Sequence, residues 1–373
     1  MDITKIIRQS CKNFQPYIAG KPIETLKREM GLKNIIKLAS NENPLGPSKK
    51  ALEAIKKNAE KVFYYPDSNS YELKKALSKK YNLPTENIFT AAGGDEIIEL
   101  VAKLFFNPED EIIMSKYSFI RYNLVTQLMG SKSVIVEMKD GFIYDLEAIA
   151  KACNKNTKAI FITNPNNPTG TYNTKVELEK FFKKIPKNKY GVKPIVIIDE
   201  AYFEYAALIK DYPNGLNYLK ENPNLIVLRT FSKIYALAGL RVGYGFASKE
   251  IVSYIERMRP TFNVNLLAQV AAIASIKDKD QVTKGQKLIN QEKDFLYKEF
   301  KKLKIDYIPS VANFILIKAT PLKGKDCFKA LLKEGVIIRA MDEYQLPDWV
   351  RITIGLPEEN KLFIKKLKKV LKK

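Results

Sequence analysis

Short apolar runs that do not alternate with polar residues dominate the middle of the chain. Three of them are rich in β-branched residues and span residues 159–163, 194–198 and 225–228. Runs of this kind are typical of strands buried on both faces, as in a parallel sheet covered by helices. A fourth stretch, residues 88–96, has the pattern of a short strand that turns into a helix near Asp95. The pattern therefore predicts a large α/β domain.

The last third of the chain has a different pattern. Long helical patterns follow Pro260, and apolar runs that predict strands occur at residues 314–317, 336–339 and 350–354. The basic run at residues 361–373 has apolar residues at helical spacing, which predicts a terminal helix packed on one side. The apolar residues of this helix are Phe363, Ile364, Leu367, Val370 and Leu371. This order of elements predicts a smaller α+β domain.

We therefore expect three parts along the chain. Pro44, Gly46 and Pro47 mark a loop that closes an N-terminal arm over residues 1–45. The large domain then spans residues 46–260, and the small C-terminal domain spans residues 261–373.

Composition narrows the chemistry, because the 373 residues include no histidine. This excludes Ser-His-Asp and Cys-His nucleophiles and any zinc site with imidazole ligands, and we expect no metal. A general base that works near neutral pH must then be a carboxylate, cysteine, tyrosine or lysine with a shifted pKa. The cysteines (Cys11, Cys153 and Cys327) are isolated, which is typical of proteins in a reducing cytosol.

Lysine and arginine number 63 against 41 acidic residues, a net charge of +22. Such a surplus can indicate nucleic acid, an anionic membrane or small anionic substrates. The lysines are spread along the chain without a nucleic-acid motif, which favours solvated helix faces. No apolar run approaches the roughly 18 residues of a membrane span, and the N-terminus does not resemble a signal peptide. We expect a cytoplasmic protein that binds neither nucleic acid nor membrane.

Each of the three central runs ends in a polar cluster: residues 164–170, 199–202 and 230–233. Open α/β sheets bind ligands outside the carboxyl ends of their strands, so these endings predict one shared crevice. A buried Asp199 needs a cation, which a protonated heterocyclic nitrogen would supply. A desolvated Lys233 would be a nucleophilic amine. This pairing is what pyridoxal phosphate (PLP) requires of its site.

A phosphate group would also find candidate ligands. Residues 93–96, Gly-Gly-Asp-Glu, open a helix after a strand, so free N–H groups could bind a dianion. Arg241 follows Lys233 by eight residues and could reach the same phosphate. Tyr117 could stack on a planar cofactor.

Each signal also has a simple structural explanation. The glycine pair could be only a tight turn, and residues 164–170 could be a plain loop. Asp199 could be a helix N-cap, and Tyr117 could serve packing alone. The combination is stronger evidence than any member, because chance would have to supply all of these strand endings in order.

The motifs together resemble the fold-type I PLP-dependent aminotransferases, specifically the histidinol-phosphate aminotransferase subgroup. The resemblance runs from about Tyr17 to the end of the chain. The matching stretches are residues 37–44, 65–67, 94–96, 164–170, 199–202, 230–233, 237–241 and 351–355. The resemblance implies a large domain with a mainly parallel sheet covered by helices, which binds PLP, and a smaller α+β C-terminal domain.

The resemblance also implies a role for each matching position. Lys233 would hold PLP as a Schiff base and shuttle a proton, and Asp199 would pair with the pyridine nitrogen. Asn167 and Tyr202 would hydrogen-bond the phenolic oxygen of the ring, on which Tyr117 would stack. The phosphate ligands would be Gly94, Asp95, Glu96, Thr230, Ser232 and Arg241, with Tyr65 reaching the cofactor of the other subunit of a homodimer. The substrate would meet Tyr17, Asn43, Arg339 and Arg351, of which the two arginines lie at or beside apolar strands.

The expected activity is transamination of a small phosphorylated amine or ketone, with histidinol phosphate and the pair of glutamate and 2-oxoglutarate as leading candidates. Residues 64–70 and 116–122 depart from the commonest family versions, and both stretches lie where they could contact the side chain of the substrate. The alternatives are another short phosphorylated hydroxyketone, an aromatic 2-oxo acid, or an amino-acid-phosphate decarboxylase. A basic nucleic-acid-binding regulator with an inactive aminotransferase fold is the alternative from a different class.

Overall fold

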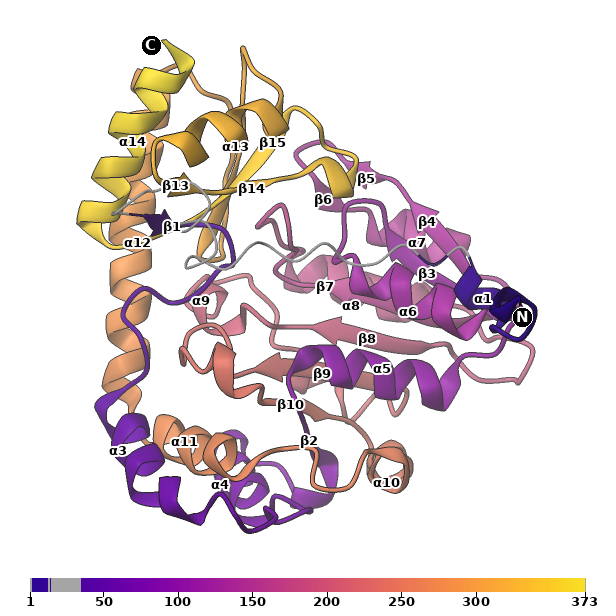
Figure 1. The fold of residues 1–373 in the computed structure, drawn as a ribbon. Helices are drawn as coiled ribbons and strands as arrows, with labels where there is room; N and C mark the ends of the chain where they lie inside the picture. The colour runs from indigo at the N-terminus through magenta and orange to yellow at the C-terminus, as the bar shows by residue number, and fades with distance from the viewer. Residues whose placement is uncertain (1, 13, 15–34, 373) are drawn as a thin grey trace.

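The computed structural model describes residues 2–12, 14 and 35–372 (Figure 1). Its large sheet has seven strands in the order β2-β10-β9-β8-β7-β3-β4. Their bounds are β2 (Ile88–Ala91), β3 (Glu111–Ser115), β4 (Lys132–Val136), β7 (Thr157–Thr163), β8 (Ile195–Asp199), β9 (Leu225–Thr230) and β10 (Gly243–Phe246). Only β10 runs antiparallel to its neighbours in this sheet. The predicted mainly parallel sheet is therefore confirmed, and each central run is a strand.

Two separate apolar cores explain why the central runs do not alternate. Ile197 belongs to the core on one face of the sheet, whereas Val196 and Ile198 belong to the core on the other. The face with Ile197 is covered by α5 (Gly94–Phe105), α6 (Arg121–Met129) and α10 (Lys249–Met258). The opposite face carries α7 (Leu146–Ala152) and α8 (Lys175–Lys184). Burial on both faces makes every position of the strand apolar.

The smaller sheet is antiparallel, in the order β11-β12-β15-β14. Its strands are β11 (Tyr307–Ile308), β12 (Phe314–Lys318), β14 (Arg339–Ala340) and β15 (Trp349–Thr353). It packs with α12 (Lys279–Lys302), α13 (Gly324–Lys333) and α14 (Pro357–Leu371) (Figure 1). The predicted terminal helix is confirmed, and its Phe363, Ile364, Leu367 and Leu371 are buried.

One predicted strand is divided. Residues 336–339 form β13 (Val336–Ile337) and β14, which belong to different sheets. The reason lies in the partners, because β13 pairs in parallel with β1 (Ile36–Lys37), whereas β14 pairs with β15. The pairing partners are distant in sequence, so no local pattern could predict that the run is divided.

A group of three helices lies at the bottom of the view in Figure 1. It contains α3 (Lys49–Asn58), α4 (Tyr71–Tyr81) and α11 (Leu266–Ile276), which pack together (Figure 1). α11 follows the boundary expected at residue 260 but packs with α3 and α4 of the expected large domain, and β1 of the expected arm pairs with β13 of the expected small domain. The boundaries expected near residues 45 and 260 therefore stay a prediction. Among the described residues, no helix combines the length and apolar character needed to cross a membrane.

The remaining elements are short. They are α1 (Gln9–Lys12), α9 (Phe203–Ala206), β5 (Met138–Lys139), β6 (Ile143–Tyr144), and the 3-10 turns η1 (Ile3–Lys5), η2 (Ala59–Lys61), η3 (Thr85–Asn87), η4 (Gly215–Tyr218), η5 (Ala238–Leu240) and η6 (Asp342–Tyr344). Several helices begin at polar caps whose side chains accept a backbone N–H bond. These caps are Ser48, Asp145, Thr174, Ser248, Asn265 and Asp278.

Candidate active site

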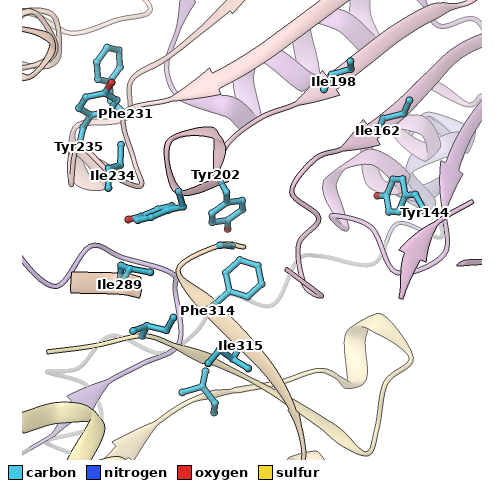
Figure 2. Close-up of a cluster of buried hydrophobic side chains, with 14 of the residues drawn as sticks. Tyr144, Ile162, Ile198, Tyr202, Phe231, Ile234, Tyr235, Ile289, Phe314 and Ile315 are labelled. Atoms are coloured by element: carbon cyan, nitrogen blue, oxygen red, sulfur yellow. The ribbon is translucent and has the colours of Figure 1, made fainter. Parts of the chain in front are cut away.

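The carboxyl ends of β2, β9, β8, β7 and β3 share one edge of the large sheet, because these strands are parallel to one another. Arg241 joins them, since it lies just before β10, whose Gly243 pairs with both Ala91 and Thr230. The small domain meets the same edge. Figure 2 shows Tyr202, from the turn after β8, facing Phe314 of β12, with ring centroids 5.1 Å apart. The structure thus brings the three predicted polar clusters together.

Asp199 is the last residue of β8, and its side chain is buried. Its Oδ1 accepts a hydrogen bond from the backbone N–H of Ala201 at 3.0 Å, and its Oδ2 accepts one from the Tyr122 hydroxyl at 2.7 Å. Both donors are neutral. Burial raises the pKa of Asp199 to about 6, although the bond from Tyr122 and the charge of Lys233 oppose the rise. A carboxylate in this setting gains free energy from a cation brought beside it.

Lys233 lies in the turn after β9, which is closed by a bond from the Ala236 N–H to the Lys233 carbonyl at 2.9 Å. Buried Ile234 anchors this turn (Figure 2), and Asn43 Nδ2 donates to the Ile234 carbonyl at 2.7 Å. The Nζ of Lys233 lies 5.5 Å from the centroid of the Tyr202 ring. The turn after β9 therefore holds the amine beside the turn after β8.

The start of α5 has the form of an anion site. Gly93 has φ +91°, and a Cβ there would come within 2.5 Å of Arg241 Nη2. Glycine thus lets the guanidinium approach the helix start closely. Within the described part of the chain, the backbone N–H groups of Gly94 and Asp95 have no acceptor, as is usual at a helix N-terminus. These N–H groups and the helix dipole favour an anion next to Arg241.

Two further phosphate candidates lie across from this helix start. The Thr230 hydroxyl donates to Ser232 Oγ at 3.0 Å and accepts from the Ser232 backbone N–H at 3.0 Å. Glu96 differs from the others, because its carboxylate accepts bonds from the Ala92 N–H at 2.6 Å and from Asn263 Nδ2 at 2.7 Å. The Glu96 side chain is therefore occupied by hydrogen bonds at the start of α5. The group of Glu96 that remains available to an anion is its backbone N–H.

Arg339 and Arg351 are opposite each other on β14 and β15. The Arg351 side chain is buried, with Nη2 donating to the Ala39 carbonyl at 2.9 Å and Nη1 donating to Asn167 Oδ1. Its Nε is buried and has no hydrogen-bond partner among the described residues. Arg339 forms an ion pair with Glu343, in which Nε lies 3.0 Å from Oε1. The register of two short strands thus makes the two arginines cross-strand neighbours.

The other expected residues fall into three situations. Tyr117 is half-buried against Phe142, with ring centroids 5.4 Å apart. Tyr65 is 82% exposed and stacks on Phe262. Tyr17 lies outside the described residues, so its expected contact with substrate stays a prediction.

Two site residues were missed by sequence reasoning. Asn41 has φ +56°, and its Nδ2 donates to the Tyr202 hydroxyl at 2.8 Å. Its place within residues 37–44 was a signal that could have found it. Tyr122, the hydrogen-bond donor to Asp199, is the last residue of the stretch 116–122, which was noted only for the side chain of the substrate. Its contact with Asp199 has no local signal, because tertiary packing brings α6 to the end of β8.

These residues fit PLP. Asp199 is a buried carboxylate that the described residues meet only with neutral hydrogen-bond donors, which suits a protonated ring nitrogen. The helix start with Arg241 suits a phosphate, and the anchored Lys233 suits an aldehyde. When bound, PLP supplies an electron sink for the bonds of an attached amino group.

The comparisons agree with this chemistry. The model of the family "Aminotransferase class I and II" matches residues 33–367. Histidinol-phosphate aminotransferase 2 of Carboxydothermus hydrogenoformans is 45% identical over 366 residues, 98% of this chain and 99% of the relative. The histidinol-phosphate aminotransferase of Caldicellulosiruptor saccharolyticus is 45% identical over 98% of this chain and 100% of the relative.

Solved structures share the fold. The histidinol-phosphate aminotransferase of Clostridium acetobutylicum has a TM-score of 0.83 at 27% identity and covers 91% of this chain and 99% of its own. The Sinorhizobium meliloti enzyme in complex with pyridoxal-5'-phosphate has a TM-score of 0.86 at 24% identity, with 97% and 98% covered.

The chain therefore belongs to the class I and II aminotransferase family and is a PLP-dependent transaminase. Within this family its similar sequences include the histidinol-phosphate aminotransferases, the subgroup that the motifs indicated.

Proposed function

We propose that this enzyme transfers the amino group of histidinol phosphate to 2-oxoglutarate. Relatives that are 45% identical over nearly the full length carry the name histidinol-phosphate aminotransferase. The single structural observation that carries the proposal is the pair of arginines, Arg339 and Arg351, opposite each other on β14 and β15. Two guanidinium forks supply the paired charges that a dianionic phosphate requires in a partly desolvated pocket.

Each proposed role follows from where the side chain lies. The amine of Lys233 would hold the cofactor covalently and then move the proton of the substrate carbon, because a free amine at the sheet edge is both nucleophile and base. Asp199 would hold the ring nitrogen protonated, while Asn167 and Tyr202 would bind the phenolic oxygen. The start of α5, Thr230, Ser232 and Arg241 would fix the phosphate.

Substrate selection would depend on Arg339, which Glu343 holds at the site. A phosphorylated substrate would gain at least one charge-assisted hydrogen bond from this guanidinium, and losing such a contact costs about 1.5–3 kcal/mol. That corresponds to roughly tenfold to a hundredfold in affinity.

The test compares histidinol phosphate with histidinol as amino donors, with glutamate formed from 2-oxoglutarate as the readout. Wild type is expected to prefer the phosphorylated donor, and Arg339→Ala should reduce this preference by roughly tenfold or more. The control is Arg257→Ala, an exposed arginine on α10, which should keep the preference. A wild-type preference for histidinol, or an unchanged ratio in Arg339→Ala, would refute phosphate recognition. Release of carbon dioxide from amino-acid phosphates would indicate the decarboxylase instead.

The proposal includes a homodimer with shared sites. The apolar side chains from Val62 to Tyr65 are exposed, and so is Tyr71. Such a patch on a chain of this size favours burial against a second copy. Mixing Tyr65→Ala with Lys233→Ala subunits should restore part of the activity, since one mixed site would then have both wild-type residues. Monomeric sedimentation, or no restoration after subunit exchange, would contradict the shared site.

A cytoplasmic location is also part of the proposal. It is supported by the three cysteines, which are free thiols in the structure.

A further inference from the structure

A line of buried hydroxyl groups reaches Asp199 from the side of α6. The Tyr122 hydroxyl lies 2.7 Å from Asp199 Oδ2 and 2.8 Å from Thr163 Oγ1. Thr163, the last residue of β7, in turn lies 3.3 Å from the hydroxyl of Tyr144. All four side chains are buried.

The hydrogen atoms in this line can be assigned by counting donors. An ionised Asp199 only accepts, so the single proton of Tyr122 is committed to it. The Tyr122 oxygen must then accept from Thr163, whose own oxygen can accept from Tyr144. Tyr144 can instead donate its single proton to Asn166 Oδ1 at 3.1 Å, so the fixed part of the line begins at Thr163. The protons of Thr163 and Tyr122 therefore both point toward the carboxylate, and such aligned bonds strengthen one another.

Packing fixes the donor in place. The ring of Tyr122 stacks on Phe161, with centroids 4.3 Å apart and planes within 7°. Phe119 meets the same ring edge-on at 5.8 Å. The hydroxyl therefore sits at Asp199 before any ligand arrives, and its position requires no rearrangement.

The hydrogen bond from Tyr122 stabilises the charged form of Asp199, which burial disfavours. Burial raises the pKa of Asp199 to about 6, and the Tyr122 bond is the largest of the contributions that lower it. Among the charged groups of the described residues, Asp95 adds to the rise and Lys233 opposes it. Tyr122 itself stays protonated, because burial and then the Asp199 charge raise its pKa well above the usual value.

We propose that Tyr122 is a positioning residue that keeps Asp199 ionised and oriented for the ring nitrogen of the cofactor. The inference rests on the proposed pairing of Asp199 with that nitrogen. A protonated Asp199 would offer no charge to a pyridinium, so loss of the Tyr122 hydroxyl should weaken cofactor binding most where Asp199 begins to protonate.

The test is Tyr122→Phe, which keeps the ring on Phe161 and removes only the hydroxyl. The matched control is Tyr205→Phe, because Tyr205 is also buried and its hydroxyl has no hydrogen-bond partner among the described residues. The two readouts are the affinity of the full-length chain for PLP between about pH 5 and about pH 9, and the pH at which the infrared carbonyl band of protonated Asp199 disappears. Asp199→Asn identifies that band and also tests the role of Asp199.

Tyr122→Phe is expected to move both midpoints to higher pH by about one unit or more, since the lost bond stabilises only the charged form. Tyr205→Phe should leave them in place. Unmoved midpoints in Tyr122→Phe, or an equal shift in Tyr205→Phe, would overturn the inference. If Asp199→Asn binds PLP as wild type does at every pH, the pairing of Asp199 with the cofactor fails instead. Should Tyr122→Phe not fold, Thr163→Val removes the preceding donor and should shift the midpoints in the same direction by less.

Discussion

Two carboxylates that are adjacent in sequence, Asp199 and Glu200, are both buried at the end of β8 but have different partners. Glu200 Oε2 accepts bonds from Nε and Nη2 of buried Arg229 at 2.9 and 2.7 Å, and its Oε1 accepts from the Gly215 N–H at 2.7 Å. Within the part of the chain that the structure describes, Asp199 accepts hydrogen bonds only from two neutral donors, Tyr122 and Ala201.

We expect this difference to separate a carboxylate that stabilises the fold, Glu200, from one that binds a ligand, Asp199. Burying a charge costs free energy unless a partner of opposite charge is buried with it. Glu200 meets this condition within the protein. Burial alone would lower the pKa of Arg229, but the charge of Glu200, together with the smaller contributions of Tyr81, Tyr244 and Glu204, raises that pKa overall. Among the described residues Asp199 has no such hydrogen-bonded cation, so we predict that a ligand supplies it.

The pair of Glu200 and Arg229 also has a mechanical consequence for the site. Glu200 follows Asp199, and Arg229 precedes Thr230 on the neighbouring strand. Their ion pair therefore joins the ends of β8 and β9 beneath the residues that would hold the cofactor.

The largest expected effect comes from removing the amine near Asp199. Lys233→Ala should lower turnover by more than about 10⁴-fold, because both the covalent link and the proton carrier are lost. PLP should still bind through its phosphate, which equilibrium dialysis would detect. Lys249→Ala, at an exposed lysine, is the control that should retain activity. Near-normal turnover in Lys233→Ala would contradict its assignment.

Asp199→Asn should lower turnover by about 10²–10³-fold, since an amide of the same shape supplies no charge to the ring nitrogen. Steady-state rates at saturating PLP measure this effect. Asp348→Asn alters an exposed ion pair with Lys323 and serves as the matched change, with turnover expected to stay near wild type. An unaffected Asp199→Asn enzyme would remove the contrast between the two carboxylates.

Glu200→Gln should instead reduce stability. Removing one member of a buried pair leaves the Arg229 charge uncompensated, which typically costs about 3–5 kcal/mol. Glu147→Gln breaks only exposed pairs with Lys184 and Lys151, so a loss below about 1 kcal/mol is expected. Urea unfolding would compare the two variants. Equal losses of unfolding free energy in the two variants would show that the buried pair of Glu200 and Arg229 stabilises the fold no more than an exposed pair does.

The smallest effect concerns pH in the cofactor-free protein. The pKa of Asp199 is about 6 in the folded chain against an ordinary 3.8, so its stabilising contribution is complete below about pH 4 and is lost as pH rises through 6. A difference of about two pH units is worth about 3 kcal/mol. Wild type should therefore lose about this much unfolding free energy between pH 4 and pH 7 relative to Asp199→Asn. Parallel pH profiles for the two proteins would contradict the unpaired state of Asp199.

Much of the fold was predictable because its signals are local. The unbroken apolar runs at residues 194–198 and 225–228 indicated strands buried on both faces, and both are central strands of the sheet. The polar residues that follow them had to share one edge once the strands were parallel. This geometry made Asp199 and Lys233 candidates before any contact was known, and their catalytic roles remain predictions for the experiments above.

What the sequence alone determined was therefore the type and order of the elements, the family, and the residues at strand ends, all of which depend on neighbours along the chain. Tertiary structure decided the rest. It split residues 336–339 between two sheets, set Arg339 opposite Arg351 and paired Glu200 with Arg229. It also brought Tyr122 to Asp199 across 77 positions of sequence. Such contacts depend on strand register and helix packing between distant segments, which no local pattern of apolar and polar residues encodes.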